Sequence, residues 1–105
     1  MKFKIKVFAT LREITKTKEI ELESDNKIKV HDAIKLMTDR YGEKLANYLL
    51  EKNGEPKPVF ILMVNGVSIK ELKGLETPLK DGDVLAVLPP AVGGTDSNPF
   101  AGMLR

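Results

Sequence analysis

Apolar and polar residues alternate at the start of the chain, which is the pattern of half-buried β-strands. Residues 2–8 alternate lysine with apolar side chains and would place Phe3, Ile5 and Val7 on one face of a strand. Residues 18–23 alternate again, whereas the segment between the two stretches lacks the pattern and is expected to form a loop or a short turn. Two such strands in succession predict an antiparallel hairpin.

The period then changes to three and four residues, which predicts a helix over residues 29–41. Its apolar stripe consists of Val30, Ala33, Ile34, Met37 and Tyr41. Gly42 follows at the position where a glycine commonly ends a helix. A second helix is expected over residues 43–52, ending at Asn53-Gly54, and residues 55–58 are expected to form a loop.

Residues 59–64 form the most apolar run of the chain and predict a central strand. The Asn65-Gly66 pair is a strong signal for a tight turn, so that residues 67–69 would return as a short partner strand. Residues 72–77 are expected to be irregular. Residues 78–83 predict a polar turn rather than a calcium loop, because the ligand series of such a loop is missing.

Residues 84–88 are apolar throughout and predict a last strand that is buried on both faces. Pro89 and Pro90 stop this strand, since proline cannot donate to a strand ladder and favours an extended chain. Gly93 and Gly94 then let the backbone pass where no side chain fits. We call Pro89 and Pro90 the stem and Gly93 and Gly94 the tip. A stiff stem that ends in a tip without side chains is suited to carry the backbone into the narrow active site of another protein.

The order of strands and helices predicts an α+β fold, in which a helix covers one face of a small mixed sheet. The first and last strands would lie parallel at its centre, which is the β-grasp, or ubiquitin-like, topology. The expected domain spans residues 1–94, and residues 95–105 are expected to form a flexible extension. Phe100, Met103 and Leu104 in the extension are compatible with a short docking motif, but disorder is the default for such a segment.

The composition narrows the possible chemistry. The 105 residues are 42% hydrophobic and 30% charged, which suits one globular domain. A net charge of +2 without a basic stripe argues against nucleic acid as a partner, and the lack of a long apolar run argues against a membrane span. A cytoplasmic location is therefore expected. With no cysteine and the single histidine His31, no disulfide, thiolate nucleophile or metal site is expected.

Four short motifs together resemble one known family. They are Phe8-Ala9-Thr10-Leu11-Arg12-Glu13, Val64-Asn65-Gly66, Pro78-Leu79-Lys80-Asp81-Gly82-Asp83-Val84 and Leu88-Pro89-Pro90-Ala91-Val92-Gly93-Gly94. In this order and spacing they resemble the sulfur-carrier small subunit of molybdopterin synthase, across residues 1–94. Its relatives include the sulfur carrier of the thiamine pathway and archaeal ubiquitin-like modifiers.

The resemblance implies a sulfur-carrier function centred on Gly94. Its carboxylate would be adenylated by a ubiquitin-activating-type enzyme that uses ATP, and would then become a thiocarboxylate. The large subunit of molybdopterin synthase would hold the pterin precursor that receives the sulfur, and the small subunit would be a non-catalytic carrier that binds no cofactor itself. The residues that would present Gly94 to these partners are Gly93, Pro89, Pro90, Leu88, Phe8 and Arg12.

The chain departs from the family pattern after Gly94, because it continues to Arg105 and ties the Gly94 carboxyl to Thr95 in an amide bond. A processing protease would have to remove residues 95–105 before activation. Two other functions stay open: a modifier that Gly94 links to lysines of target proteins, and a β-grasp interaction module without C-terminal chemistry. The sulfur acceptor also stays open between molybdopterin, a tungsten pterin, a thiazole and tRNA.

Overall fold

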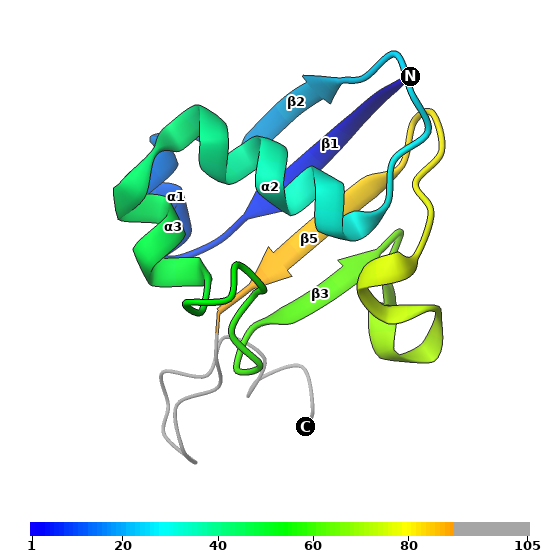
Figure 1. The fold of residues 1–105 in the computed structure, drawn as a ribbon. Helices are drawn as coiled ribbons and strands as arrows, with labels where there is room; N and C mark the ends of the chain where they lie inside the picture. Colours follow the sequence, from blue (N-terminus) through cyan, green and yellow to red (C-terminus); the bar gives the residue numbers. More distant parts are fainter. Residues whose placement is uncertain (90–105) are drawn as a thin grey trace, which may run out of the picture.

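The computed structural model describes residues 1–89, which fold into one mixed sheet with helices against one face (Figure 1). The strands are β1 (Lys2–Val7), β2 (Glu19–Glu23), β3 (Ile61–Val64), β4 (Val67–Ser68) and β5 (Val84–Leu88). The helices are α1 (Thr10–Thr15), α2 (Val30–Tyr41) and α3 (Glu43–Leu49), with short 3-10 turns at η1 (Ile69–Glu71) and η2 (Gly74–Glu76). The predicted extension, the stem residue Pro90 and the tip residues Gly93 and Gly94 lie outside the described residues.

The first and last strands lie side by side in the middle of the sheet, whose order is β2-β1-β5-β3-β4. Ile5 of β1 is opposite Ile20 in the antiparallel pair with β2 and opposite Leu85 in the parallel pair with β5. The predicted hairpin and the predicted parallel centre are therefore confirmed. Because β1 and β5 run in the same direction, their carboxyl ends lie at the same end of the sheet. The predicted stem begins there.

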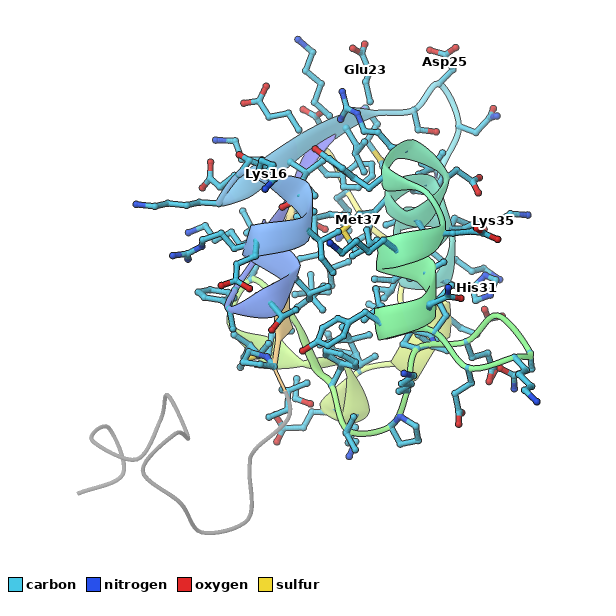
Figure 2. All side chains as sticks on the ribbon, turned by 90° about the vertical axis from the view of Figure 1, so that its left-hand side faces the viewer. Lys16, Glu23, Asp25, His31, Lys35 and Met37 are labelled. Carbon is cyan, nitrogen blue, oxygen red and sulfur yellow. The ribbon has the colours of Figure 1, made fainter. Side chains whose placement is uncertain are left out.

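The core lies between the sheet and α2. Phe3, Ile5 and Val7 are buried on one face of β1, as their alternation predicts. Four of the five residues of the predicted α2 stripe are buried: Val30, Ala33, Ile34 and Met37. Tyr41 is only partly buried at the end of the helix. Figure 2 shows Met37 pointing into the interior, whereas His31 and Lys35 point away from it. Within residues 1–89, no helix is long and apolar enough to cross a membrane.

Two of the predicted segments around the helices are wrong. The expected loop after β1 is helix α1, which buries Leu11 and Thr15; six residues are too few to show a helical period. Helix α3 ends at Leu49 rather than at residue 52, because Leu50 forms an isolated bridge with Pro56 and the Glu51 N–H donates to the Glu55 carbonyl.

Three predictions about the later strands also need correction. Strand β3 begins at Ile61 rather than at residue 59, and it is second from the edge while β5 is central. The segment expected to be irregular contains η2. Strand β5 is not buried on both faces along its whole length. Leu85 and Val87 are buried against the core, whereas Val84 and Ala86 on the other face are half-buried and Leu88 at the end of the strand is buried. An unbroken apolar run cannot show which face is open.

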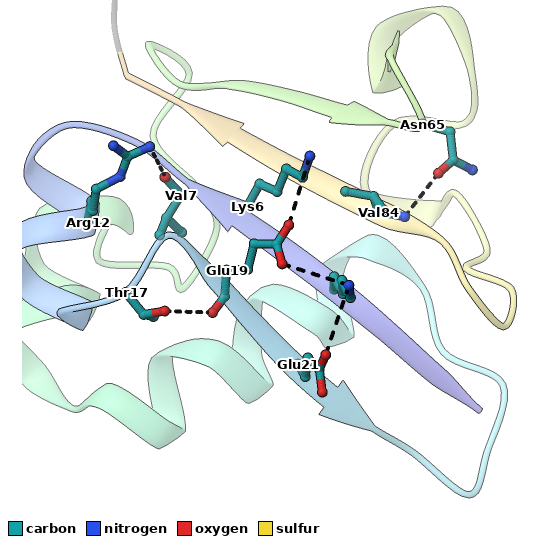
Figure 3. Close-up of polar contacts among 9 residues, drawn as sticks. Lys6, Val7, Arg12, Thr17, Glu19, Glu21, Asn65 and Val84 are labelled. Atoms are coloured by element: carbon teal, nitrogen blue, oxygen red, sulfur yellow. Dashed lines mark hydrogen bonds and ion pairs between the residues drawn. The ribbon is translucent and has the colours of Figure 1, made fainter.

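Asn65 joins the β3–β4 turn to the start of β5. Asn65 and Gly66 both have positive φ, of 50° and 85°, as a tight type I′ turn requires. The Asn65 side chain donates to Asp83 Oδ1 at 2.9 Å. It also accepts from the Val84 N–H at 3.0 Å (Figure 3). The Asp83 carboxylate also accepts from the Lys80 N–H at 2.7 Å, so it serves the predicted polar turn.

We expect Asn65→Ala to lower the free energy of unfolding by about 2 kcal/mol, because it removes two hydrogen bonds and places alanine at positive φ. Asn65→Gly removes the same bonds but tolerates the conformation, so its cost should be about 1 kcal/mol. Urea unfolding of both variants separates the contribution of the two hydrogen bonds from the cost of placing alanine at positive φ. Equal stabilities for Asn65→Ala and the unchanged chain would contradict this role of the side chain.

The outer edge of β2 carries two side-chain hydrogen bonds. Thr17 Oγ1 donates to the Glu19 carbonyl at 2.9 Å (Figure 3), and Arg40 Nη1 of α2 donates to the Glu21 carbonyl at 3.0 Å. Since β2 is the edge strand, these carbonyls have no neighbouring strand to bond. The side chains satisfy them instead.

Candidate functional site

The face of the sheet opposite α2 carries the candidate site, and we call it the open face. Side chains alternate along each strand, and Ile5 and Leu85 point into the core, so their sequence neighbours point to the open face. The register between β5 and β3 adds the residues opposite them. The open face therefore comprises Lys4, Lys6, Glu19, Glu21, Ile61, Met63, Val84, Ala86 and Leu88.

One half of the open face is charged. Lys4 lies 3.8 Å from Glu19 and 3.9 Å from Glu21, and Lys6 lies 3.9 Å from Glu19 (Figure 3). These pairs are well exposed, and exposed ion pairs contribute little to stability. This half is a hydrated border beside the apolar half.

The other half of the open face is apolar and lies on β5 and β3. Leu88 at the end of β5 is opposite Ile61, and Ala86 is opposite Met63. Ile61 is 39% exposed, although it belongs to the most apolar run of the chain. Ile61 is thus the exposed apolar side chain of this half, because Ala86 and Met63 are half-buried and Leu88 is buried.

Phe8 and Arg12 lie at the end of the sheet where strands β1 and β5 terminate. Val7 is opposite Val87, so Phe8 and Leu88 follow at neighbouring positions. The Arg12 guanidinium carbon lies 5.6 Å from the centre of the Phe8 ring, which is a cation–π distance. The structure thus brings together four of the predicted site residues, which are Phe8, Arg12, Leu88 and Pro89.

The guanidinium of Arg12 is only weakly bonded within the domain. Its Nη2 donates to the Val7 carbonyl at 3.5 Å, and its buried Nε has no hydrogen-bond partner among residues 1–89 (Figure 3). No carboxylate in the described part of the chain forms an ion pair with it. Arg12 and Phe8 line an open hollow of about 650 Å³ with Lys6, Lys18 and Glu19. Arg12 as a whole is half-buried, so a carboxylate or carbonyl oxygen outside the domain can reach its guanidinium only at atoms other than the buried Nε.

The backbone at Ala9 is strained where it turns from β1 into α1. Ala9 has φ 52° and ψ −128°, a conformation in which side chains are crowded and glycine is normally found. Such strain costs on the order of 1–3 kcal/mol and is common at functional sites. Here it sets the direction of α1 and thereby places Arg12 beside Phe8.

We expect Ala9→Gly to raise the free energy of unfolding by about 1 kcal/mol, because relief of the strain exceeds the added flexibility of the unfolded chain. Ala46→Gly in α3 is the matched control and should lower it by about 1 kcal/mol. Urea unfolding gives both values. Destabilisation by both changes would show that Ala9 is not strained.

Sequence reasoning missed the apolar side chains that β3 adds to the open face. Ile61 and Met63 belong to a run without alternation, so the sequence does not show which of its residues face outward. Their register with β5 supplies that information. Gly94, Gly93 and Pro90 carry the predicted chemistry and its stem, and they lie outside the described residues.

Comparisons with known proteins give a consistent result. The ThiS family matches residues 5–94. Small archaeal modifier protein 3 of Haloferax volcanii is 36% identical over 94 residues, which cover 90% of this chain and 100% of that protein. The solution structure of small archaeal modifier protein 1 from Methanosarcina acetivorans is 37% identical, covers 89% of this chain and 96% of its own, and has a TM-score of 0.76.

A second similar structure carries a subunit designation. It is a protein from Pyrococcus furiosus assigned as subunit 1 of a molybdopterin converting factor, with 28% identity, a TM-score of 0.65, and coverage of 87% of this chain and 99% of its own. Together these structures confirm the predicted β-grasp fold. Because the family match spans most of the chain, the chain belongs to the ThiS family of ubiquitin-like sulfur carriers.

Proposed function

We propose that this chain carries sulfur as a thiocarboxylate on Gly94 for molybdopterin biosynthesis, after a protease removes residues 95–105. The observation that carries the proposal is that the family match ends at Gly94, on a stem that starts from the central strand of the sheet. The similarity to a protein assigned as a molybdopterin converting factor subunit supports the pterin as acceptor.

The proposed chemistry needs a main-chain carboxylate and no thiol of this chain. A carboxylate oxygen of Gly94 attacks the α-phosphorus of ATP in the activating enzyme, and pyrophosphate leaves. A hydrosulfide ion supplied by a partner then attacks the acyl carbon, breaks its bond to the AMP oxygen and leaves the thiocarboxylate and free AMP. AMP makes this step feasible because a free carboxylate has no comparable leaving group. ATP belongs to the activating enzyme, and this chain binds no cofactor in the scheme.

The open face and the weakly bonded Arg12 would form the partner contact. Ile61 offers exposed apolar area close to the end of β5, while Phe8 and Arg12 offer an aromatic ring and a guanidinium group at the same end of the sheet. Aromatic and arginine side chains are frequent anchors of protein interfaces. The expected partners are the adenylating enzyme and the large subunit of molybdopterin synthase, which would use this contact in turn.

An intact mass of the protein purified from its native cells tests the proposal. We expect a chain that ends at Gly94, with part of the population heavier by the replacement of one oxygen with sulfur. Retention of Arg105 in every molecule while the pathway is active would contradict the proposal and favour the interaction module.

A second function has its own support, because small archaeal modifier protein 3 covers 90% of this chain at 36% identity. In that function Gly94 forms an isopeptide bond with a lysine of a target protein. Conjugates that persist in reducing agent would favour the modifier, and sulfur transfer to a pterin precursor would favour the carrier. Both functions require the same free Gly94 carboxylate.

A further inference from the structure

An apolar groove on the far side of β3 shares only Ile61 with the residues named for the partner contact of the proposed function. It has a volume of about 460 Å³ and is lined mainly by Pro56, Pro58, Phe60, Ile61, Ile69 and Leu75. Strand β4 pairs only with Met63 and Val64, so the first half of β3 has no strand on this side among residues 1–89. The groove therefore combines apolar side chains with an open stretch of strand edge.

The groove lies next to the point where the chain leaves the sheet. Ile61 in its wall is opposite Leu88, the last residue of β5, and paired strands lie about 5 Å apart. Figure 1 shows the loop before β3 and the end of β5 at the same end of the sheet. A segment that follows β5 therefore starts beside the groove.

Residues 95–105 supply an apolar segment that the family does not account for, since the family match ends at Gly94. Phe100, Met103 and Leu104 are its large apolar residues. Residues 90–97 precede them, and eight residues can span at most about 28 Å when extended. That reach is ample for a groove that begins one strand away.

We propose that residues 98–105 of the unprocessed chain bind in this groove, with Phe100 and Leu104 as the apolar anchors. Lys57 and Lys70 lie at the groove, and Asp96 is the acidic residue that precedes the anchors. The tether raises the local concentration of the segment to the millimolar range, so weak binding suffices. The biological use of this contact rests on the proposed function: the extension stays on the domain until cleavage and then frees the groove.

Methyl NMR spectra of the full-length chain and of a chain that ends at Gly94 test the proposal. We expect the methyl resonances of Ile61, Ile69 and Leu75 to differ between the two chains, because the Phe100 ring shifts nearby methyl groups. A full-length chain with Phe100, Met103 and Leu104 replaced by serine should give the groove resonances of the shorter chain. A synthetic peptide of residues 95–105, added to the shorter chain, should reproduce the shifts with a Kd of about 1 mM.

Two surface variants provide a matched control. Ile61 in the groove and Leu36 on α2 are almost equally exposed, at 39% and 38%. Ile61→Ser should abolish the shifts of the groove resonances, whereas Leu36→Ser should leave these shifts unchanged. Groove resonances that are identical in both chains, or that persist in the triple-serine chain, would overturn the proposal. Shifts that grow with protein concentration would also overturn it and would indicate a second copy in the groove. Maturation is measured separately by intact mass, so either proposal can fail alone.

Discussion

A chain that ends at Gly94 should support ATP–pyrophosphate exchange by the activating enzyme at least about 100-fold faster than the full-length chain. The reason is chemical: the carboxylate oxygen is the nucleophile, and in the longer chain that carbonyl is held in an amide bond to Thr95. The measurement needs only the two purified chains, the activating enzyme and labelled pyrophosphate.

Two truncated variants separate the effect of the free carboxylate on the exchange rate from the effect of side-chain size at the last residue. Gly94→Ala in the chain that ends at residue 94 keeps the carboxylate but adds a methyl group, and a chain that ends at Thr95 adds a larger side chain. Both should exchange more slowly than the chain that ends in Gly94, in the order of side-chain size. Equal exchange by the full-length chain would show that activation does not occur at Gly94.

Leu85→Ala should lower the free energy of unfolding by about 3 kcal/mol, a large part of the stability of a small domain. Leu85 is 0% exposed and lies in the central strand, opposite Ile5 of β1 and Val64 of β3. Its truncation leaves a cavity where the two halves of the sheet meet α2. Urea unfolding measures the loss.

Val84→Ala is the control for this change, because Val84 is the neighbour of Leu85 on the half-buried open face. We expect it to cost less than about 1 kcal/mol. If it cost as much as Leu85→Ala, the assignment of the two faces of β5 would be wrong.

Much of the fold could be predicted because most elements carry a clear period. The alternation in β1 and β2 and the apolar stripe of α2 each identified an element and its buried face. Helix α1 was missed, since it is six residues long and begins at a strained alanine. The open face of β5 was missed as well, because all five residues of that strand are apolar.

The candidate site was predictable only in part. The resemblance placed Phe8, Arg12 and Leu88 near the stem, and the register of β1 and β5 explains why they meet. The stacking of Arg12 on Phe8 and its unbonded Nε depend on the turn at Ala9, which no sequence pattern announces. Ile61 joined the site only through its pairing with Leu88, which is a contact between distant parts of the chain.

Both edges of the sheet are poor templates for a further strand. Thr17 and Arg40 occupy carbonyls on the outer edge of β2, and β4 at the other edge is two residues long. Exposed strand edges are the usual route by which sheets from different molecules join and aggregate. Copies of this domain are therefore expected to resist the joining of their sheets at β2 and β4, and within residues 1–89 it is the first half of β3 that leaves strand edge open.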